Sequence, residues 1–270
     1  MGKDSKGAKA AREAAAQARA AAESDLRARD RKIRLIGGGV VVVIMAALLA
    51  IPLMQGRADG PTTDNSAALP TGVTSDTYGV KIGSAWSAAD ADSIPKLQIW
   101  EDFQCPACKS TEDAVGSVIE QLVTEGKLRV EYRPTIFLDE NLKALNTAAG
   151  NPNSSLYASM AFGCAVDQGK GLEYHRTIFQ AQPLDEGTGF SINDLTAIAG
   201  IAGVADSTTF TECLSSKKYE GWVNNSYDAF SKEGVSSTPT AFLNGTELTQ
   251  DVLRDPTALQ AAIDQAAATK

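Results

Sequence analysis

The chain has 270 residues, of which 43% are hydrophobic, and a formal net charge of −8. This is the composition of an ordinary globular protein, long enough to bury a core. The charge is unevenly distributed, since residues 1–34 hold ten Lys or Arg and five Asp or Glu, and the remainder carries −13. An acidic main part argues against nucleic acid as a partner.

Residues 1–34 are rich in Ala, Arg, Lys and Glu. Their helix propensity is high, but they have almost no apolar stripe. We expect a basic cytoplasmic tail, either a solvated helix or disordered. A helix that contacts lipid headgroups is the alternative.

Residues 35–54 contain no charged residue. A helix of this length, at about 1.5 Å per residue, matches the roughly 30 Å of bilayer hydrocarbon. Basic residues crowd its N-terminal side, which predicts a single-pass transmembrane helix with a cytoplasmic N-terminus. A cleaved secretory signal is the competing interpretation, but its leader and apolar core are usually shorter. Either interpretation places the main domain outside the cytoplasm, and the favoured one keeps it anchored in the cell membrane.

Residues 55–77 are mostly Gly, Pro, Ser, Thr and Asp, which is typical of a flexible linker. The folded domain is therefore expected over residues 78–270. In it, residues 96–103 read as a strand, 106–126 as a helix and 128–132 as a strand. This order indicates a βαβ unit with parallel pairing.

The rest of the domain is predicted mostly helical over about 140–232, then closes with two short strands and a helix. The strands are expected at 240–243 and from 247, joined by the turn signal Asn244-Gly245. The last helix is expected at 256–268. The predicted fold class is α/β.

Four cysteines lie at positions 105, 108, 164 and 213. Cys105 and Cys108 form a CPAC motif between the predicted strand and helix. Free N–H groups and the dipole at a helix N-terminus favour a thiolate over a thiol, and Pro106 suits the first helical turn. Cys105 is expected to be the exposed nucleophile, and Cys108, one turn later, the resolving thiol.

A CxxC pair has two other interpretations. It forms half of many zinc sites, but those need a second close pair of ligands. Here Cys164 and Cys213 are far apart and His175 is the only histidine, so we expect no metal site. An inert structural disulfide is the other alternative, although a helix tip after a strand is an exposed place for one.

The run IWEDFQCPAC, with GVSSTPTAFLNG more than 100 residues later, resembles the DsbA-like branch of the thioredoxin superfamily. It is most similar to the membrane-anchored actinobacterial members. The segment ASMAFGCAVDQGKGLEYHRTIFQAQP resembles the helical insertion of this family. The resemblance covers about residues 78–270 and implies a thioredoxin-like fold with a helical insertion domain, preceded by the transmembrane helix.

The resemblance also implies roles for individual residues. Thr238-Pro239 matches the cis-proline loop, whose backbone pairs with substrate peptides beside the dithiol. Cys164 and Cys213 match a structural disulfide, although two buried free thiols remain the alternative. The best-known oxidases have CPHC, and Ala107 replaces a histidine that would make the disulfide a stronger oxidant.

Two further ionisable residues have open roles. Glu101 is the nearest acid upstream of the dithiol and a possible proton acceptor for Cys108. We favour a surface or strand-end carboxylate, because acids are rarely buried. His175 lies in a helical pattern and is expected to be a packed core residue rather than a catalyst, for want of triad partners.

The expected function is thiol–disulfide exchange that forms disulfides in exported, cysteine-containing proteins, without a small cofactor. The reduced enzyme then needs a reoxidant, for which we expect a quinone-linked membrane partner. A disulfide reductase or isomerase, for example in cytochrome maturation, is the nearest alternative. A non-catalytic thioredoxin-like binding module is the alternative from another class.

Overall fold

The computed structural model describes residues 63–269. The predicted tail (1–34) and anchor (35–54) lie outside the described residues, and so does the first part of the predicted linker. Within the described residues, no helix combines the length and apolarity needed to cross a bilayer.

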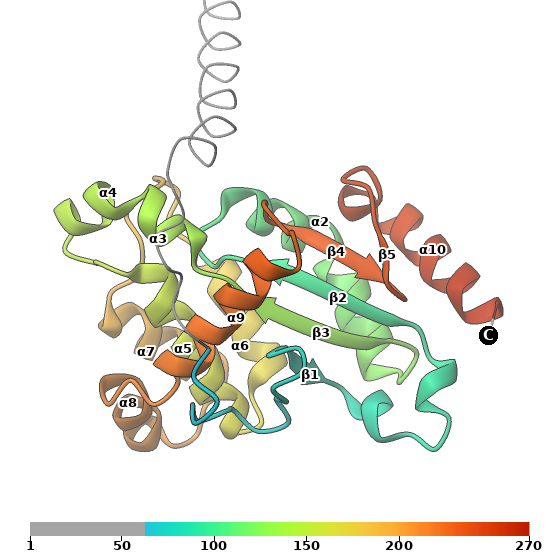
Figure 1. The fold of residues 1–270 in the computed structure, drawn as a ribbon, viewed down its shortest axis with the longest axis horizontal. Helices are drawn as coiled ribbons and strands as arrows, with labels where there is room; N and C mark the ends of the chain where they lie inside the picture. Colours follow the sequence, from blue (N-terminus) through green and yellow to red (C-terminus); the bar gives the residue numbers. More distant parts are fainter. Residues whose placement is uncertain (1–62, 270) are drawn as a thin grey trace, which may run out of the picture. The chain divides into compact units, whose positions relative to one another are not determined.

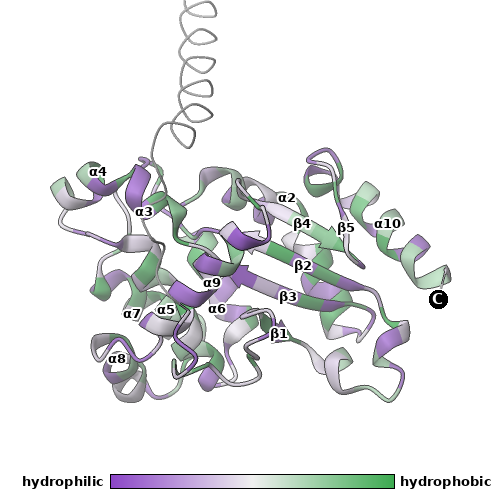
Figure 2. Ribbon diagram, viewed as in Figure 1, coloured by the Kyte–Doolittle hydropathy of each residue, from purple (hydrophilic) through white to green (hydrophobic). Residues whose placement is uncertain are grey.

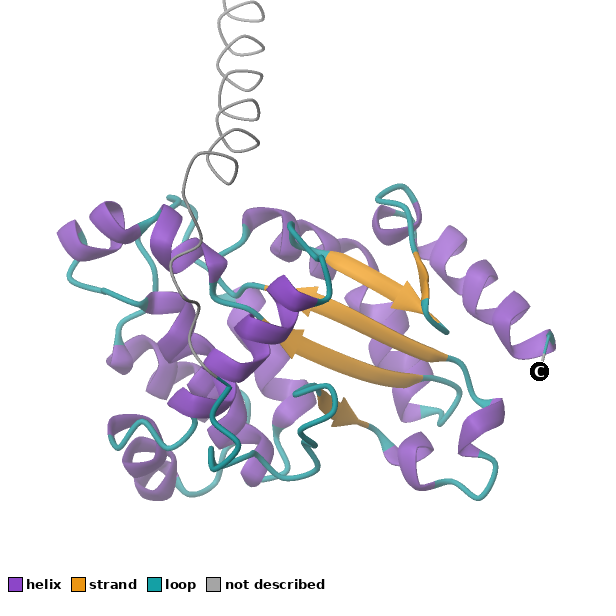
Figure 3. Cartoon of the chain, viewed as in Figure 1, coloured by secondary structure: helices purple, strands orange, loops and turns teal. Residues whose placement is uncertain are grey.

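A five-stranded sheet forms the centre of the domain, in the order β1-β3-β2-β4-β5 (Figures 1 and 3). β2 and β3 are parallel, as the predicted βαβ unit requires, and every other neighbouring pair is antiparallel. The strands are β1 (Val80–Ile82), β2 (Lys96–Glu101), β3 (Arg129–Pro134), β4 (Thr240–Leu243) and β5 (Thr246–Glu247).

The helix α2 (Pro106–Thr124) connects β2 to β3 and buries Val115, Ile119 and Leu122 at helical spacing. Its end is two residues earlier than predicted because Gly126 has a positive φ of 70°, where the backbone cannot continue a right-handed helix. α2 and α9 cover opposite faces of the sheet (Figure 1). In Figure 2 the strand β4 is mostly hydrophobic, whereas β3 carries charged residues between its apolar ones.

The predicted helical insertion lies between β3 and β4. Its helices are α3 (Phe137–Asn141), α4 (Lys143–Ala148), α5 (Ser154–Asp167), α6 (Gly171–Gln180), α7 (Ile192–Ile201), α8 (Ser207–Ser215) and α9 (Glu220–Lys232). After β5, the chain ends with α10 (Pro256–Ala268), as predicted. The part of the chain that the structure describes also contains the short 3-10 helices η1 (Ser84–Ser87), η2 (Ala91–Ser93) and η3 (Val252–Arg254).

The sheet differs from the sequence analysis in several details. β3 spans 129–134 rather than 128–132, and β5 begins one residue earlier than expected, at Thr246. β1 was not expected, because three residues at a sheet edge are too few to show an alternating pattern. The predicted strand 96–103 ends at Glu101, since the chain turns there and the Cys105 amide donates to the Asp102 carbonyl over 2.9 Å. This turn positions the CPAC motif beyond the strand.

The described half of the predicted linker packs onto the domain. Residues 63–79 contain no helix or strand, yet the side chain of Asn225 in α9 accepts from the Asp64 amide and donates to the Asp64 carbonyl, each over 2.8 Å. Val73 is buried, and Trp222 donates to the Tyr78 carbonyl. The packed domain therefore includes residues that the sequence assigned to the linker, because specific polar pairs offset the shortage of apolar side chains.

Candidate active site

The two CPAC cysteines occupy the N-terminal turn of α2. Cys105 is the N-cap residue, and Pro106 and Ala107 are the first two helical residues. Both cysteines are free thiols. Cys108 is completely buried, and only 6% of Cys105 is exposed. The expectation that Cys105 is an exposed residue is thus wrong, because other parts of the chain pack around the helix tip.

The two thiols have opposite electrostatic environments. The Cys108 thiol donates a hydrogen bond to the Cys105 sulfur, and with Thr238 and the amides of Cys108 and Ala107 it lowers the pKa of Cys105 to about 6. Burial raises the pKa of Cys108 well above its usual value, and the neighbouring Cys105 adds to this. At neutral pH, Cys105 is therefore a thiolate and Cys108 a thiol.

The loop before β4 lies against the dithiol. The Thr238-Pro239 peptide bond is cis, and the Cys105 sulfur lies 3.5 Å from the Thr238 carbonyl oxygen. β4 follows directly and pairs with β2, with Thr240 opposite Trp100. Because β2 leads into the CPAC turn, this pairing brings the two distant motifs together.

Two glutamine side chains hold the CPAC motif in place through hydrogen bonds. The sequence analysis did not identify them. Gln182, just after α6, donates from Nε2 to the carbonyl oxygens of Phe103, at 2.8 Å, and Cys105, at 3.2 Å. Gln104 is buried and donates to Asp139 and Ser155. No local pattern marks such residues, because each hydrogen bond joins the motif region to the insertion: Gln182 belongs to the insertion, and the partners of Gln104 do.

Glu101 is the last residue of β2, as the strand-end interpretation expected, but it is buried, so the surface interpretation is wrong. Its Oε2 atom lies 2.7 Å from Nε2 of His175 in α6. Burial raises the pKa of Glu101 to about 8 and that of Glu112, in α2, to the same value. The negative charge of Glu101 also contributes to the raised pKa of Cys108. Its role as a proton acceptor stays a prediction.

His175 is packed in the core, as expected. Its ring stacks on Tyr132 with centroids 3.7 Å apart, and Phe103 lies edge-on to it. Glu112, four residues after Cys108, was not identified from the sequence. The helical pattern places it on the same face of α2 as Cys108, but nothing local shows that α6 covers this face.

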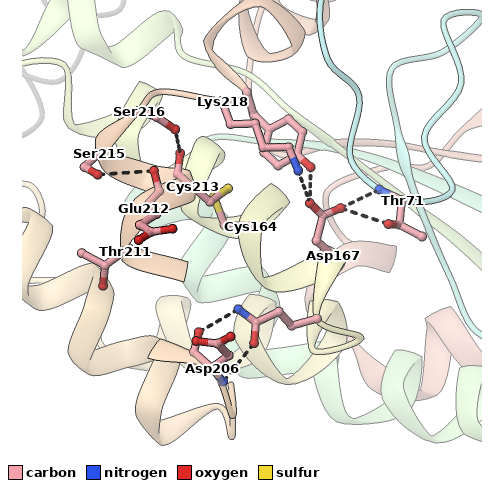
Figure 4. Close-up of a disulfide and its surroundings, with 12 residues drawn as sticks. Thr71, Cys164, Asp167, Asp206, Thr211, Glu212, Cys213, Ser215, Ser216 and Lys218 are labelled. Atoms are coloured by element: carbon pink, nitrogen blue, oxygen red, sulfur yellow. Dashed lines mark hydrogen bonds and ion pairs between the residues drawn. A yellow bond between two sulfur atoms is a disulfide. The ribbon is translucent and has the colours of Figure 1, made fainter. Parts of the chain in front are cut away.

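Cys164 and Cys213 form a disulfide between α5 and α8 within the insertion (Figure 4). Nearby, Asp167 accepts hydrogen bonds from Thr71 and Lys218, which ties residues of the predicted linker to the same region. Neither cysteine is available to complete a zinc site with the CPAC pair.

A helix-tip dithiol beside a cis-proline loop, on a sheet with a helical insertion, defines a thioredoxin-like thiol–disulfide oxidoreductase. A family profile described as thioredoxin matches residues 88–265. The chain belongs to the thioredoxin family and, by its structural neighbours, to its DsbA-like members. None of the curated proteins matches the chain.

Solved structures with the same fold include MdbA from Actinomyces oris, described as a thiol-disulfide oxidoreductase. It is 25% identical, with a TM-score of 0.61, and the match covers 77% of this chain and 97% of that one. Reduced DsbG from Mycobacterium tuberculosis is 27% identical with a TM-score of 0.57, covering 71% and 93%. Oxidised DsbA from the same organism is 26% identical with a TM-score of 0.55, covering 71% and 98%.

Proposed function

We propose that this protein forms disulfide bonds in exported, cysteine-containing proteins through the Cys105–Cys108 pair. The observation that carries the proposal is the asymmetry of the dithiol. A stabilised Cys105 thiolate is a good leaving group, and Cys108 keeps its proton. A protein that oxidises other thiols needs this arrangement. When the reduced form of the enzyme is stabilised, its disulfide is readily reduced and therefore oxidises substrate thiols.

The reaction begins with the Cys105–Cys108 disulfide. A substrate thiolate attacks the Cys105 sulfur, the S–S bond breaks, and Cys108 leaves and takes up a proton. A second substrate thiolate then attacks the substrate sulfur of the mixed disulfide, which releases Cys105 as a thiolate. Two substrate thiols are thereby oxidised to a disulfide, and the enzyme becomes a dithiol. No small cofactor takes part.

The substrate is held as an extended peptide beside the Thr238-Pro239 loop, where the backbone of Thr238 pairs with it. Pro106 and Ala107 are the first residues of α2, directly after Cys105, and tune its thiol. The contact between Cys105 and the Thr238 carbonyl supports this proposal, because it places the attacked sulfur within reach of a peptide bound there.

The site of action follows from the sequence. The uncharged segment 35–54 after a basic tail supports a cell-membrane anchor with the domain outside the cytoplasm. A quinone-linked membrane protein reoxidises the dithiol. The disulfide between Cys164 and Cys213 agrees with an oxidising location, where such bonds persist.

A reductase or isomerase is the second candidate, because Ala107 lacks the charge of the histidine in CPHC oxidases. The equilibrium with glutathione separates the candidates. A potential near −120 mV is typical of DsbA and one near −270 mV of thioredoxin, so a value close to the latter favours the reductase.

The test is oxidative refolding of a reduced, unfolded protein that needs disulfides, with excess glutathione disulfide as the reoxidant. The wild type is expected to accelerate recovery, and the Cys105→Ala variant is expected to have no effect above background. Ser110→Ala, an exposed change in the same helix turn, is the matched control and should match the wild type. Equal acceleration by Cys105→Ala would contradict the proposal and favour a binding module.

A further inference from the structure

Three ionisable side chains converge behind the dithiol from three different elements. Glu101 comes from the end of β2, Glu112 from α2 and His175 from α6. One ligand atom from each lies within 4.8 Å of the others. His175 joins the acids, since its Nε2 lies 2.7 Å from Glu101 Oε2 and its Nδ1 lies 3.9 Å from Glu112 Oε2.

This cluster has two carboxyl groups and no basic partner except the imidazole. Among the described residues, the ion pairs of Glu101 and Glu112 are all with His175. Oxygen Oε1 of Glu101 and Oε1 of Glu112 are buried with no hydrogen-bond donor among the described residues, and the two carboxyl groups face each other closely enough to share a proton. Because buried polar atoms are rarely left without a partner, the cluster lacks a positive ligand that both carboxyl groups face.

Two of the three residues of the cluster, Glu112 and His175, line a cavity that opens to solvent. This cavity of about 210 Å³ is lined by Glu112, His175 and Tyr132 from the inside, and by Glu120 and Arg176 near its rim. Glu120 and Arg176 are bound to each other over 2.6 Å, so the guanidinium is already paired with Glu120. The cavity is large enough for a cation with its remaining water ligands, each of which needs about 30 Å³.

The orientation of His175 is fixed by packing. Its ring is stacked on Tyr132 and enclosed by Phe103, Phe162 and Phe179. A rigid imidazole with two carboxylates is a donor set of the kind that binds zinc with three protein ligands and one open position. Two ligand atoms that each lie about 2 Å from a tetrahedral cation are about 3.3 Å apart. The Glu101 carboxylate, now 2.7 Å from Nε2 of His175, therefore has to move outward to admit the cation.

We propose that Glu101, Glu112 and His175 form a binding site for one divalent transition cation of the zinc type, entered through the adjacent cavity. The site is separate from the CPAC thiols and does not need them as ligands. Its cation cross-links β2, α2 and α6 directly behind the dithiol. The cation binds the folded protein and not the unfolded chain. Its binding therefore stabilises the folded state, as does any ligand selective for the native state.

The experiment uses the full-length protein without an affinity tag, in the oxidised form, because the Cys105–Cys108 disulfide removes the thiolates as competing zinc ligands. Zinc binding is measured by calorimetry, and cobalt binding by its visible spectrum. We expect about one cation per chain, a cobalt spectrum without a thiolate charge-transfer band, and a higher melting temperature with zinc.

Glu112→Gln and His175→Gln are expected to weaken zinc binding at least tenfold and to remove the thermal shift. Circular dichroism establishes that each variant is folded, and the milder Glu112→Gln carries the conclusion if His175→Gln unfolds. Glu120→Gln is the matched control, on the same helix and cavity but outside the cluster, and should bind zinc like the wild type. Absence of binding, or binding unchanged in Glu112→Gln, would overturn the proposal and leave a proton shared between the two carboxyl groups.

Discussion

The sulfur of Cys105 lies 3.5 Å from the carbonyl oxygen of Thr238, although 133 residues separate the two in the chain. β2 and β4 are neighbours in the sheet, so the turn after β2 meets the loop before β4. The nucleophile and the loop proposed to hold its substrate are thus positioned by one pair of antiparallel strands. Changes on either side of this contact should alter the reactivity of Cys105.

The reactivity of Cys105 should depend on pH with a midpoint near 6, the pKa of its thiol. The thiolate is the reactive form, so the rate of alkylation of the reduced protein should rise through this pH and level off above it. A free cysteine would show its midpoint about two units higher. The other reduced cysteine, Cys108, is buried and keeps its proton, so it should contribute little.

The Cys108→Ala variant should raise that midpoint, because the thiol of Cys108 is the largest cause of the lowered pKa of Cys105. Stopped-flow alkylation between pH 4 and 9 measures both proteins. An unchanged midpoint would show that the helix terminus alone stabilises the thiolate.

Replacing Thr238 by Val should also raise the midpoint, but by less than Cys108→Ala. The substitution keeps the shape of the side chain and removes its hydroxyl, which is a smaller contributor to the lowered pKa of Cys105. The Thr238 hydroxyl is buried and has no hydrogen-bond partner among the described residues, so its removal leaves no other polar group unpaired. Thr246→Val, at an exposed position in β5, is the control. If both threonine variants gave the wild-type profile, the hydroxyl would have no part in tuning the sulfur.

Removing the disulfide between Cys164 and Cys213 should lower the free energy of unfolding. The two residues are 49 apart in sequence, and the chain-entropy model assigns roughly 4 kcal/mol to a loop of this length. Urea denaturation of the Cys164→Ala, Cys213→Ala double variant measures the loss. The refolding activity of the folded variant should be kept, because neither cysteine belongs to the α2 dithiol. A loss below about 1 kcal/mol would show that packing of α5 against α8 suffices.

Replacing Asn225 by Ala should destabilise the domain by about 2 kcal/mol, near 1 kcal/mol for each hydrogen bond lost to the backbone of Asp64. Asn224→Ala, at the half-buried neighbouring position of α9, is the control and should have a smaller effect. Chemical denaturation of both variants measures their free energies of unfolding. If Asn225→Ala were as stable as Asn224→Ala, the residues near Asp64 would not be packed on the domain and would form a free linker.

The sequence alone was sufficient for the local part of the structure. The β2–α2–β3 unit, the Asn244-Gly245 turn and α10 follow from side-chain periodicity, turn residues and capping, all of which act over a few residues. The same short-range chemistry predicted the dithiol, because a strand followed by CPAC and a helix needs no distant partner. The proposals for the anchor and the export of the domain also rest on local composition.

Only the tertiary structure decided which distant groups meet. The near-complete burial of Cys105 and of Glu101 depends on the loop at Thr238 and on α6, and neither is visible from residues 96–108. The same is true of the Asp64–Asn225 pairing, which brings the predicted linker into the domain. Burial and electrostatic environment depend on what packs over a side chain, and in this domain the covering groups come from segments tens of residues away along the chain.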